Sequence, residues 1–429
     1  MKKIISALAV SALVLGSAAA KTSVNLNYRN GAYLYSFNTN GEDDANNAKT
    51  STFGGLDTYN GGQDTMSLKA SGDILDFQAD IQPKVNNELR FNVLKIGAKW
   101  GAFHTQMGWN GDGINGGYRV TNDASNNEGE FFETYKLGSL FNSYSNYADS
   151  QANINKVFED RAMHAQADYT ISADDLKIKI IGSVISNRAW KNSNTNKLYN
   201  DGDKGWSVFV DVAKAKDFKF EAFLKGAKEV AKVKGVAVDE AKLLLVPGAY
   251  FQGTMVDGLI FTVGGAATLY DGKLSDFSID WRGRYAVNSQ ISVTYYGKLS
   301  SWSEDDCAAA SDYKIAKNVG IFGKLKTTDV VYATKTALWN FVNVKYVLNP
   351  TVTLAASVAA LTDVAQFENQ DKYGTTLSIH PNAEFFAGKG ASITVGAAFG
   401  IAGIGSDDTK YGEKTDFAFA IPVLFRVKM

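Results

Sequence analysis

Charged residues recur at every second position in two segments of the sequence. Asp280, Arg282 and Arg284 show this spacing, and Lys177 and Lys179 show it in an earlier segment. Every second residue of a β-strand lies on the same face, so each segment would carry its charges together. Where such a face borders confined water, guanidinium and ammonium groups raise the local concentration of anions.

Two interpretations of these charges are open from the sequence. They attract anions if they face confined water, but they have no such effect if they are solvated or paired with neighbours such as Asp80 and Glu221. The formal net charge of the chain is only -1, which does not decide between these interpretations. It does argue against general nucleic-acid binding, which needs a strongly basic surface.

A third charged group lies in the longest irregular stretch, Asn110 to Asn155. Glu128, Glu130 and Glu133 stand there beside aromatic residues. A stretch of this length without a clean period indicates either a functional loop or a disordered one.

Catalytic patterns in the sequence are weak. The three histidines, His104, His164 and His380, lie far apart, and no Ser or Cys stands in a recognisable nucleophile motif. His164 and Asp168 lie four residues apart and would share a strand face, but polar residues on one face do so by default. We therefore expect no enzymatic activity and no cofactor.

Two acidic runs, 42–44 and 304–306, offer the carboxylate oxygens that Ca²⁺ prefers. Neither run has the spacing of a calcium-binding loop. We therefore interpret both as solvated loops and expect no metal site.

The strongest structural pattern lies in the C-terminal segment, Asp416 to Met429. Apolar residues occupy every second position from Phe417 onward, which is a strand period. Such a strand leaves a long adhesive edge unless its sheet closes, so a lipid-facing strand of a membrane barrel is favoured over a soluble sandwich. Pro422 fits a closed sheet poorly because it has no N–H to donate to the neighbouring strand. By parity it would face inward, where water can hydrogen-bond to the carbonyl that is left without a donor.

The N-terminal segment has the order of a cleavable secretory signal. Lys2 and Lys3 precede an apolar run from Ile4 to Leu15, and small residues follow up to Ala20. We expect residues 1–20 to be a cleavable signal peptide, with a permanent membrane anchor as the alternative. Residues 21–429 would then form a single outer-membrane β-barrel with a long loop at 110–155.

Composition is consistent with that architecture. No later segment approaches 18 consecutive apolar residues, which excludes a helical membrane protein. Forty Gly against five Pro, with 12% aromatic residues, are typical of many strands joined by tight turns. The single Cys307 cannot form an internal disulfide, so an exported chain must be stable without one.

The rest of the chain alternates strand, short turn, strand and long polar loop. This rhythm predicts an all-β, transmembrane, antiparallel up-and-down barrel of about 18 strands, between 16 and 20, depending on whether 313–336 is a loop or a hairpin. Alternation slips phase between Leu89 and Leu94, which indicates a β-bulge. Gly226 to Lys242 is rich in Ala and Lys, so we expect a loop with one or two helical turns.

The N-terminal signal pattern, the uninterrupted alternation and the apolar terminal strand together resemble bacterial outer-membrane β-barrel porins over the whole mature chain. A looser likeness, to spirochaete outer-membrane barrels, rests on Ala98, Trp100, Phe103, Gly108, Asp112, Gly113 and Gly116. The chain departs from the porin pattern at Met429, where porins usually end in Phe.

This resemblance implies an outer-membrane location in a diderm, Gram-negative-type bacterium and a water-filled channel for passive diffusion of small solutes or ions. Its implied partners are outer-membrane lipid, the barrel assembly machinery acting on the C-terminal strand, and the solutes, with no nucleic acid. The protein would be a monomer or a homotrimer. A selectivity that leans toward anions follows if Asp280, Arg282, Arg284, Lys177 and Lys179 line the pore.

By the same resemblance, the loop that holds Glu128, Glu130 and Glu133 is a candidate to fold inward and constrict the pore, with a flap on the outer surface as the alternative. Two other functions are open. One is a barrel-anchored surface adhesin or antigen that binds host or partner molecules through its loops. The other is a transporter of hydrophobic substrates, although such barrels generally carry an N-terminal plug and strands here begin near Val24.

Overall fold

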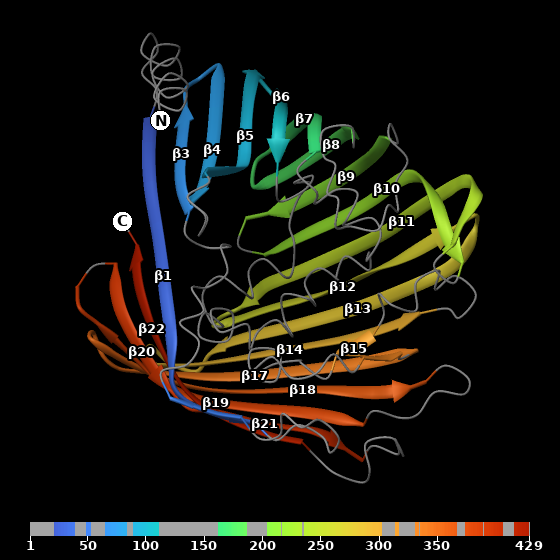
Figure 1. Cartoon of the computed structure of the whole chain (residues 1–429). Coiled ribbons are helices and arrows are strands. Elements are labelled where there is room, and N and C mark those ends of the chain that lie inside the picture. Colours follow the sequence, from blue (N-terminus) through green and yellow to red (C-terminus); the bar gives the residue numbers. More distant parts are fainter. Residues whose placement is uncertain are drawn as a thin grey trace.

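In the computed structural model, the described part of the chain folds almost entirely as β-strands (Figure 1). No helix in its described part is long and apolar enough to cross a membrane. The described residues are 21–38, 49–52, 65–83, 89–110, 162–186, 204–215, 217–233, 236–302, 314–316, 331–333, 335–366, 374–388, 390–405 and 416–428.

The strands in chain order are β1 (Lys21–Asn38), β2 (Lys49–Thr52), β3 (Thr65–Ser71), β4 (Leu75–Pro83), β5 (Leu89–Trp100), β6 (Phe103–Asn110), β7 (Ala162–Ala173), β8 (Leu176–Ser186), β9 (Lys204–Lys214), β10 (Phe218–Val233) and β11 (Val236–Val256). They continue as β12 (Leu259–Tyr270), β13 (Lys273–Ala286), β14 (Ile291–Trp302), β15 (Lys314–Ala316), β16 (Val331–Ala333), β17 (Thr336–Asn349), β18 (Val352–Ala365), β19 (Thr375–Phe386), β20 (Ala391–Gly396), β21 (Ala398–Ile404) and β22 (Asp416–Lys428).

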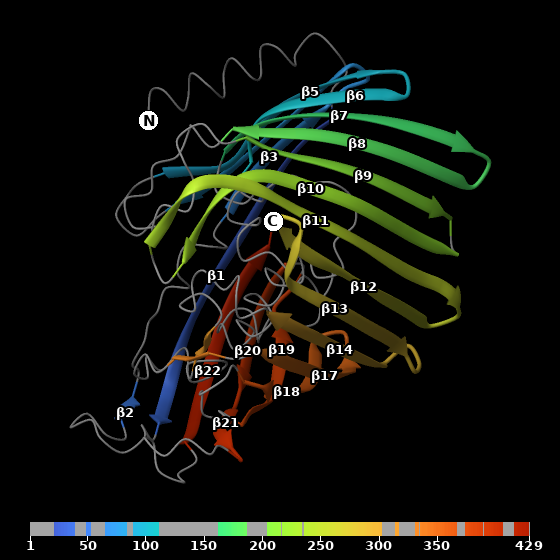
Figure 2. The same ribbon diagram turned by 90° about the vertical axis from the view of Figure 1, so that its right-hand side faces the viewer.

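Strand β1 closes the sheet into a barrel. On one side it pairs with β3 along Lys21–Asn27 and with β2 along Tyr35–Asn38, and on the other side it pairs with β22 along Asn27–Asn38. Figure 2 shows β1 beside β22 and the curved wall that runs from β5 to β14. Closure gives each strand of the ring a neighbour on both sides, so the barrel has no free edge.

The ring has 18 strand positions in the part of the chain that the structure describes. Twenty strands share one sheet. Two positions hold two strands each, because β2 and β3 both lie along β1, and β20 and β21 both lie between β19 and β22. Strand β14 pairs directly with β17, while β15 and β16 form a separate pair. The predicted closed barrel of about 18 strands is therefore confirmed.

Connections of different length collect at the two rims of the barrel. One rim carries short turns, and the described chain ends lie there too, since Lys21 pairs with Ser71 and Lys428 with Asn27. The opposite rim carries most of the longer connections, as the alternation predicted. The short turns span residues 72–74, 101–102, 174–175, 215–217, 257–258, 287–290, 350–351 and 387–390.

Two connections at the opposite rim are only two residues long. Strands β12 and β13 are joined by Asp271 and Gly272, whose φ angles of 52° and 78° are those of a hairpin turn that needs positive φ at both positions. Strands β10 and β11 pair up to Val233 and Val236.

The second of these hairpins corrects one prediction. Gly226 to Lys242 is not a loop with helical turns, because its backbone continues the β10–β11 ladder. Helix propensity is worth only tenths of a kcal/mol per residue, and the ladder pairs backbone groups of this segment across the hairpin. The strand pairing between β10 and β11, which continues from the barrel wall, therefore outweighs the helix propensity of this segment.

The predicted bulge lies at Asn92. Asp80 of β4 pairs with Val93 and Ile81 pairs with Phe91, which leaves Asn92 as the extra residue of β5. One extra residue in a strand reverses the face of every side chain that follows it.

Pro422 interrupts the ladder at a place where both neighbouring strands are irregular. The β1 register shifts at Leu34, and the ladder of the strand on the other side breaks at Ala397, between β20 and β21. The Ala397 N–H donates to the carbonyl of Pro381 at 3.0 Å. Pro422 is buried on the face opposite the exposed Phe425, so its predicted inward placement is confirmed.

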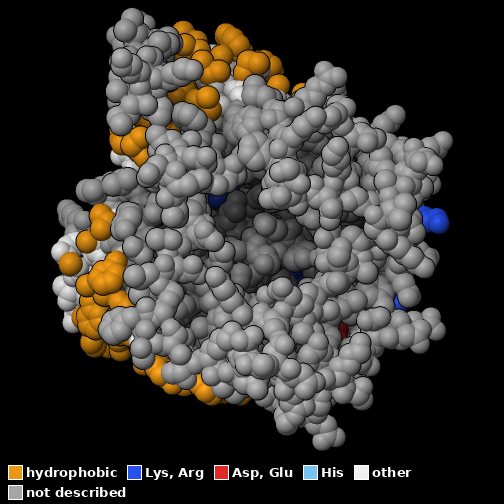
Figure 3. Space-filling model, viewed as in Figure 1, with side chains coloured by type: hydrophobic (Ala, Val, Ile, Leu, Met, Phe, Trp, Pro, Cys, Tyr) orange, Lys and Arg blue, Asp and Glu red, His pale blue; other side chains and the backbone are white. Residues whose placement is uncertain are grey.

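The two faces of the sheet have opposite character. Large apolar side chains such as Ile96, Val184 and Phe425 are exposed on the outer face, and Figure 3 shows hydrophobic side chains gathered along the outer edge of the molecule. The opposite face carries buried polar side chains. An apolar exterior with a polar interior is the arrangement of transmembrane β-barrels.

The expected signal peptide at 1–20 and the acidic runs at 42–44 and 304–306 lie outside the described residues. The same is true of 319–325, one strand of the expected hairpin.

Candidate functional site

Polar side chains line the inner face of the barrel wall. Strand β7 shows the pattern, since Asp168 is 4% exposed and the next residue, Tyr169, is 48% exposed on the outer face. The register keeps inner-face residues of adjacent strands opposite one another. Buried polar side chains on this face include Gln166, Ser183, Ser207, Glu221, Gln252, Thr262, Arg282, Thr294, Lys298, Asn343, Ser357, Thr376, Ser378 and His380.

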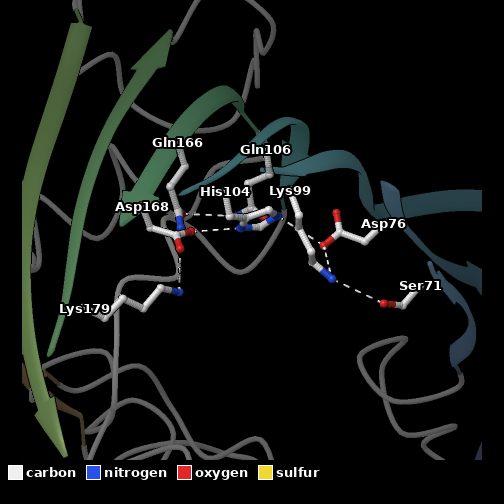
Figure 4. Close-up of polar contacts among 8 residues, drawn as sticks. All are labelled: Ser71, Asp76, Lys99, His104, Gln106, Gln166, Asp168 and Lys179. Carbon is white, nitrogen blue, oxygen red and sulfur yellow. Dashed lines mark hydrogen bonds and ion pairs between the residues drawn. The ribbon is translucent and has the colours of Figure 1, made fainter. Parts of the chain in front are cut away.

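Five charged or titratable side chains form an ionic ladder across strands β4 to β8 (Figure 4). The ladder runs Lys99, Asp76, His104, Asp168, Lys179, with two acids placed between three basic groups. Lys99, His104 and Asp168 occupy one row of the register, because Lys99 pairs with His104 and His104 with Asp168. The ionic ladder is therefore fixed by strand register and not by a loop.

The contacts of the ionic ladder are short. His104 Nδ1 is hydrogen-bonded to Asp168 Oδ2 at 2.9 Å, and Nε2 forms an ion pair with Asp76 Oδ2 at 3.1 Å that lacks the alignment of a hydrogen bond. Lys179 Nζ lies 3.3 Å from Asp168 Oδ1, and Lys99 Nζ lies 3.5 Å from Asp76 Oδ2. Each carboxylate therefore joins the central ring to one lysine.

Gly97 makes room for the centre of the ionic ladder. It is the register partner of Asp76, and a Cβ at this position would collide with the Asp76 carboxylate and with His104 Nε2. Only a residue without a side chain allows the carboxylate and the ring to meet over the backbone of β5.

Exposure differs between the acids and the lysines of the ionic ladder. The Lys99 and Lys179 side chains are 36% and 38% exposed, whereas Asp168 is almost completely buried. The ammonium groups of Lys99 and Lys179 are thus more accessible from the lumen than the Asp168 carboxylate, which forms an ion pair with Lys179. A cluster that is nearly neutral in sum can in this way present positive charge to a solute.

Acidic groups extend the row beyond Lys179. Lys179 pairs by register with Asp211 of β9, and Asp211 pairs with Glu221 of β10. The Asp211 and Glu221 side chains are hydrogen-bonded to each other, and Asp211 also interacts electrostatically with Lys179. Lys179 is therefore paired with acids, as the second interpretation of the wall charges allowed, although its ion-pair partner is Asp168.

A second basic region lies on β13. Arg282 is 8% exposed, while Tyr285 on the opposite face is 48% exposed, so the strand directs its arginines inward. Arg282 pairs by register with Tyr296 and Arg284 with Thr294, both of which are buried on the inner face of β14. The burial of Arg282 and the exposure of Tyr285 agree with the parity of this strand, and the pore-lining role of its charged residues stays a prediction.

The other predicted site residues have different outcomes. Lys177 is exposed near the short-turn rim and shares the parity of Lys179. The backbone of Asp280 pairs with that of Lys298, but its side chain lies outside the described residues. Glu128, Glu130 and Glu133 also lie outside them.

Sequence reasoning missed the ionic ladder because its members come from separate strands. His104 and Asp168 are neighbours across β6 and β7, which are joined by a connection of about fifty residues. The sequence pairing of His164 with Asp168 is replaced by that of His104 with Asp168. The only local signal was that polar residues alternate along each strand. This alternation assigns a side chain to a face but does not show which residue of another strand it contacts.

Comparison with known proteins gives structural neighbours only. No family model matches the chain. No curated protein matches it either.

Three solved structures that align over nearly the whole chain are distant from it in sequence. OccK11 of Pseudomonas aeruginosa is 9% identical with a TM-score of 0.48, covering 96% of each chain. OprB of Pseudomonas putida is 10% identical with a TM-score of 0.47, covering 98% of this chain and 96% of that one. An anion-selective porin from Comamonas acidovorans is 10% identical with a TM-score of 0.46, covering 95% of this chain and 99% of that one.

Proposed function

We propose that this protein is an outer-membrane porin, a water-filled channel for passive diffusion of small hydrophilic solutes or ions. The observation that carries this proposal is the closed ring of 18 strand positions with an apolar outer face and a polar inner face. Barrels of 16 to 18 strands are wide enough to leave an aqueous lumen. A polar wall around that lumen replaces part of the hydration that a solute loses on entry.

The channel leans toward anions in this proposal. Arg282 and Arg284 line one part of the wall, and the half-exposed Lys179 lines another. Cations on a water-filled, low-dielectric wall concentrate anions beside them. Lys177 and Asp280 belong to the same pore-lining set, and the acidic loop residues Glu128, Glu130 and Glu133 are the proposed constriction opposite them.

The experiment that tests the channel is conductance in planar lipid bilayers. Purified, heat-modifiable barrel added to one side should produce discrete current steps, and a KCl gradient should give a reversal potential of the sign for anion preference. A folded barrel that gives no steps would refute the channel and favour an adhesin or antigen that uses the barrel as an anchor. Current steps with cation preference would refute only the selectivity.

The remaining parts of the proposal concern location and assembly. Residues 1–20 export the chain to the outer membrane of a diderm bacterium, where outer-membrane lipid surrounds a monomer or homotrimer. The barrel assembly machinery recognises the C-terminal strand, β22, and the protein has no enzymatic activity. The narrower likeness to spirochaete barrels stays a prediction that rests on residues between Ala98 and Gly116.

A further inference from the structure

An amide side chain lies on the outer, lipid-facing side of β17. Asn340 shares the parity of Val342, which is 38% exposed, whereas Phe341 between them is 4% exposed on the inner face. The hydroxyl of Tyr295, which is exposed on the outer face of β14, donates to Asn340 Oδ1 at 2.9 Å. This hydrogen bond places the amide on the outside of the barrel wall and not in the lumen.

Asn340 lies well inside the apolar band of the outer face. Thr336, the first residue of β17, stands at the rim of longer connections, where its hydroxyl is hydrogen-bonded to that of Ser301. Four residues along a tilted strand correspond to a depth of about 10 Å, in an apolar band about 25 Å tall. Leu338 and Val342 share the outward parity on either side of Asn340 along the same strand. The amide is therefore set among apolar side chains near the middle of the membrane.

Hydrocarbon does not satisfy this amide. The side chain has two N–H donors and an oxygen with two lone pairs. Tyr295 uses one lone pair, and no acceptor in the described part of the chain receives an N–H of Asn340. An unpaired polar group inside a bilayer is costly because no water is there to bind it. A partner that brings an acceptor to this depth would therefore stabilise the assembled protein.

The residues beside Asn340 leave room for such a partner. Its register neighbours are Gly297 of β14 and Ala360 of β18. The indole ring of Trp281, from β13, lies across Gly297, where a Cβ would collide with it. Small residues allow two surfaces within a membrane to approach closely enough for hydrogen bonds between them. These four residues, on strands that lie side by side (Figure 1), form the Asn340 row.

We propose that the Asn340 row is the surface through which copies of this chain associate, with Asn340 at the three-fold axis of the homotrimer. An amide is self-complementary because it both donates and accepts hydrogen bonds. Each Asn340 donates an N–H to the remaining lone pair of Asn340 in the next copy, which closes a symmetric ring of amides. A second copy satisfies both the donor and the acceptor, whereas an acyl chain offers neither.

Cysteine cross-linking tests where the copies meet. In a chain whose single cysteine is removed by Cys307→Ser, Asn340→Cys puts a thiol at the proposed axis. Oxidation in the membrane should join about two thirds of the chains in pairs, because one disulfide uses two of the three thiols around the axis. Met107→Cys is the matched control, since Met107 is exposed on the outer face of β6, away from the Asn340 row, and this variant should stay uncross-linked.

A second test measures the mass of the assembly by light scattering in detergent. Asn340→Leu together with Tyr295→Phe removes the polar pair and keeps the side chains close to their original size. The barrel should fold as before and remain heat-modifiable, because lipid accepts the apolar pair, but the trimer should be lost and only monomer should remain. Asn340→Gln keeps an amide at this position and should retain the trimer.

Two results would overturn this inference. A trimer that survives the apolar double variant would show that the amide does not hold the copies together. A wild-type barrel that stays monomeric in its own membrane, with no cross-linking of Asn340→Cys, would leave hydroxyl or ester groups of lipid as the partners of the amide.

The inference rests on the proposed outer-membrane channel, but the two fail differently. A folded monomer that conducts in planar bilayers refutes only the contact between copies. A cross-linked trimer that gives no current refutes only the channel.

Discussion

Reversing the two arginines of β13 is the sharpest test of the proposed anion preference. Arg282→Glu together with Arg284→Glu changes the wall by four unit charges without altering strand length or parity. In water, one unit charge about 6 Å from a passing ion contributes about 0.7 kcal/mol, so the double change amounts to about 2.8 kcal/mol before screening. Both residues lie on the inner face, where this field acts on the solute path.

Salt determines how much of that field an ion experiences. With a Debye length of about 10 Å at 0.1 M, roughly half of the energy remains, about 1.5 kcal/mol, which is about a tenfold change in local ion concentration. At 1 M the length is about 3 Å and the change falls to about twofold. The reversal potential should therefore move toward cations, strongly at low salt and weakly at high salt.

The control makes the same change of charge at the rim of the barrel instead of along the wall. Lys273 and Lys335 are exposed beside the rim of longer connections, and replacing both with Glu also changes the chain by four units. This pair should leave the reversal potential nearly unchanged. Because Arg282 is nearly buried, heat-modifiability must first show that the β13 variant folds, and Arg284→Glu alone provides a milder version. An unchanged reversal potential at low salt in a folded double variant would show that these arginines do not line the conduction path.

Three further predictions concern the wall itself. Deleting Phe425 to Met429 removes the last backbone pairs of β22 with both β1 and β20, so we expect an open, protease-sensitive species; normal levels of heat-modifiable barrel would contradict the closure. Asp168→Asn removes the charge that holds His104 and its neighbouring lysine, which should lower stability by about 2 kcal/mol, read as a lower heat-modification temperature. Gly97→Ala should lower that temperature through its clash with the ladder, by about 1–3 kcal/mol, while the control Gly182→Ala meets open space and should not. Equal temperatures for these two glycine variants would refute the close packing over β5.

Local pattern predicted much of this barrel because side-chain alternation acts residue by residue. The outward row of β22, from Phe417 to Phe425, follows from the period of two alone, and so does the inward placement of Arg282. The bulge at Asn92 was visible as a slip of phase, since one extra residue reverses every side chain after it. Pairing also overrode local pattern once, at Gly226 to Lys242, where an adjacent ladder outweighed helix propensity.

The sequence by itself therefore determined the class of fold, the approximate number of strands and the faces on which residues such as Arg282 and Pro422 lie. Only the tertiary structure decided which inner-face residues meet. His104 reaches Asp168 and Asp76 because the four strands β4 to β7 are in register, and Gly97 leaves the space in which they touch. Register is a property of a pair of strands, because it is fixed by the hydrogen bonds between them. Loops of any length can join the two strands, so the sequence of one strand does not specify its register.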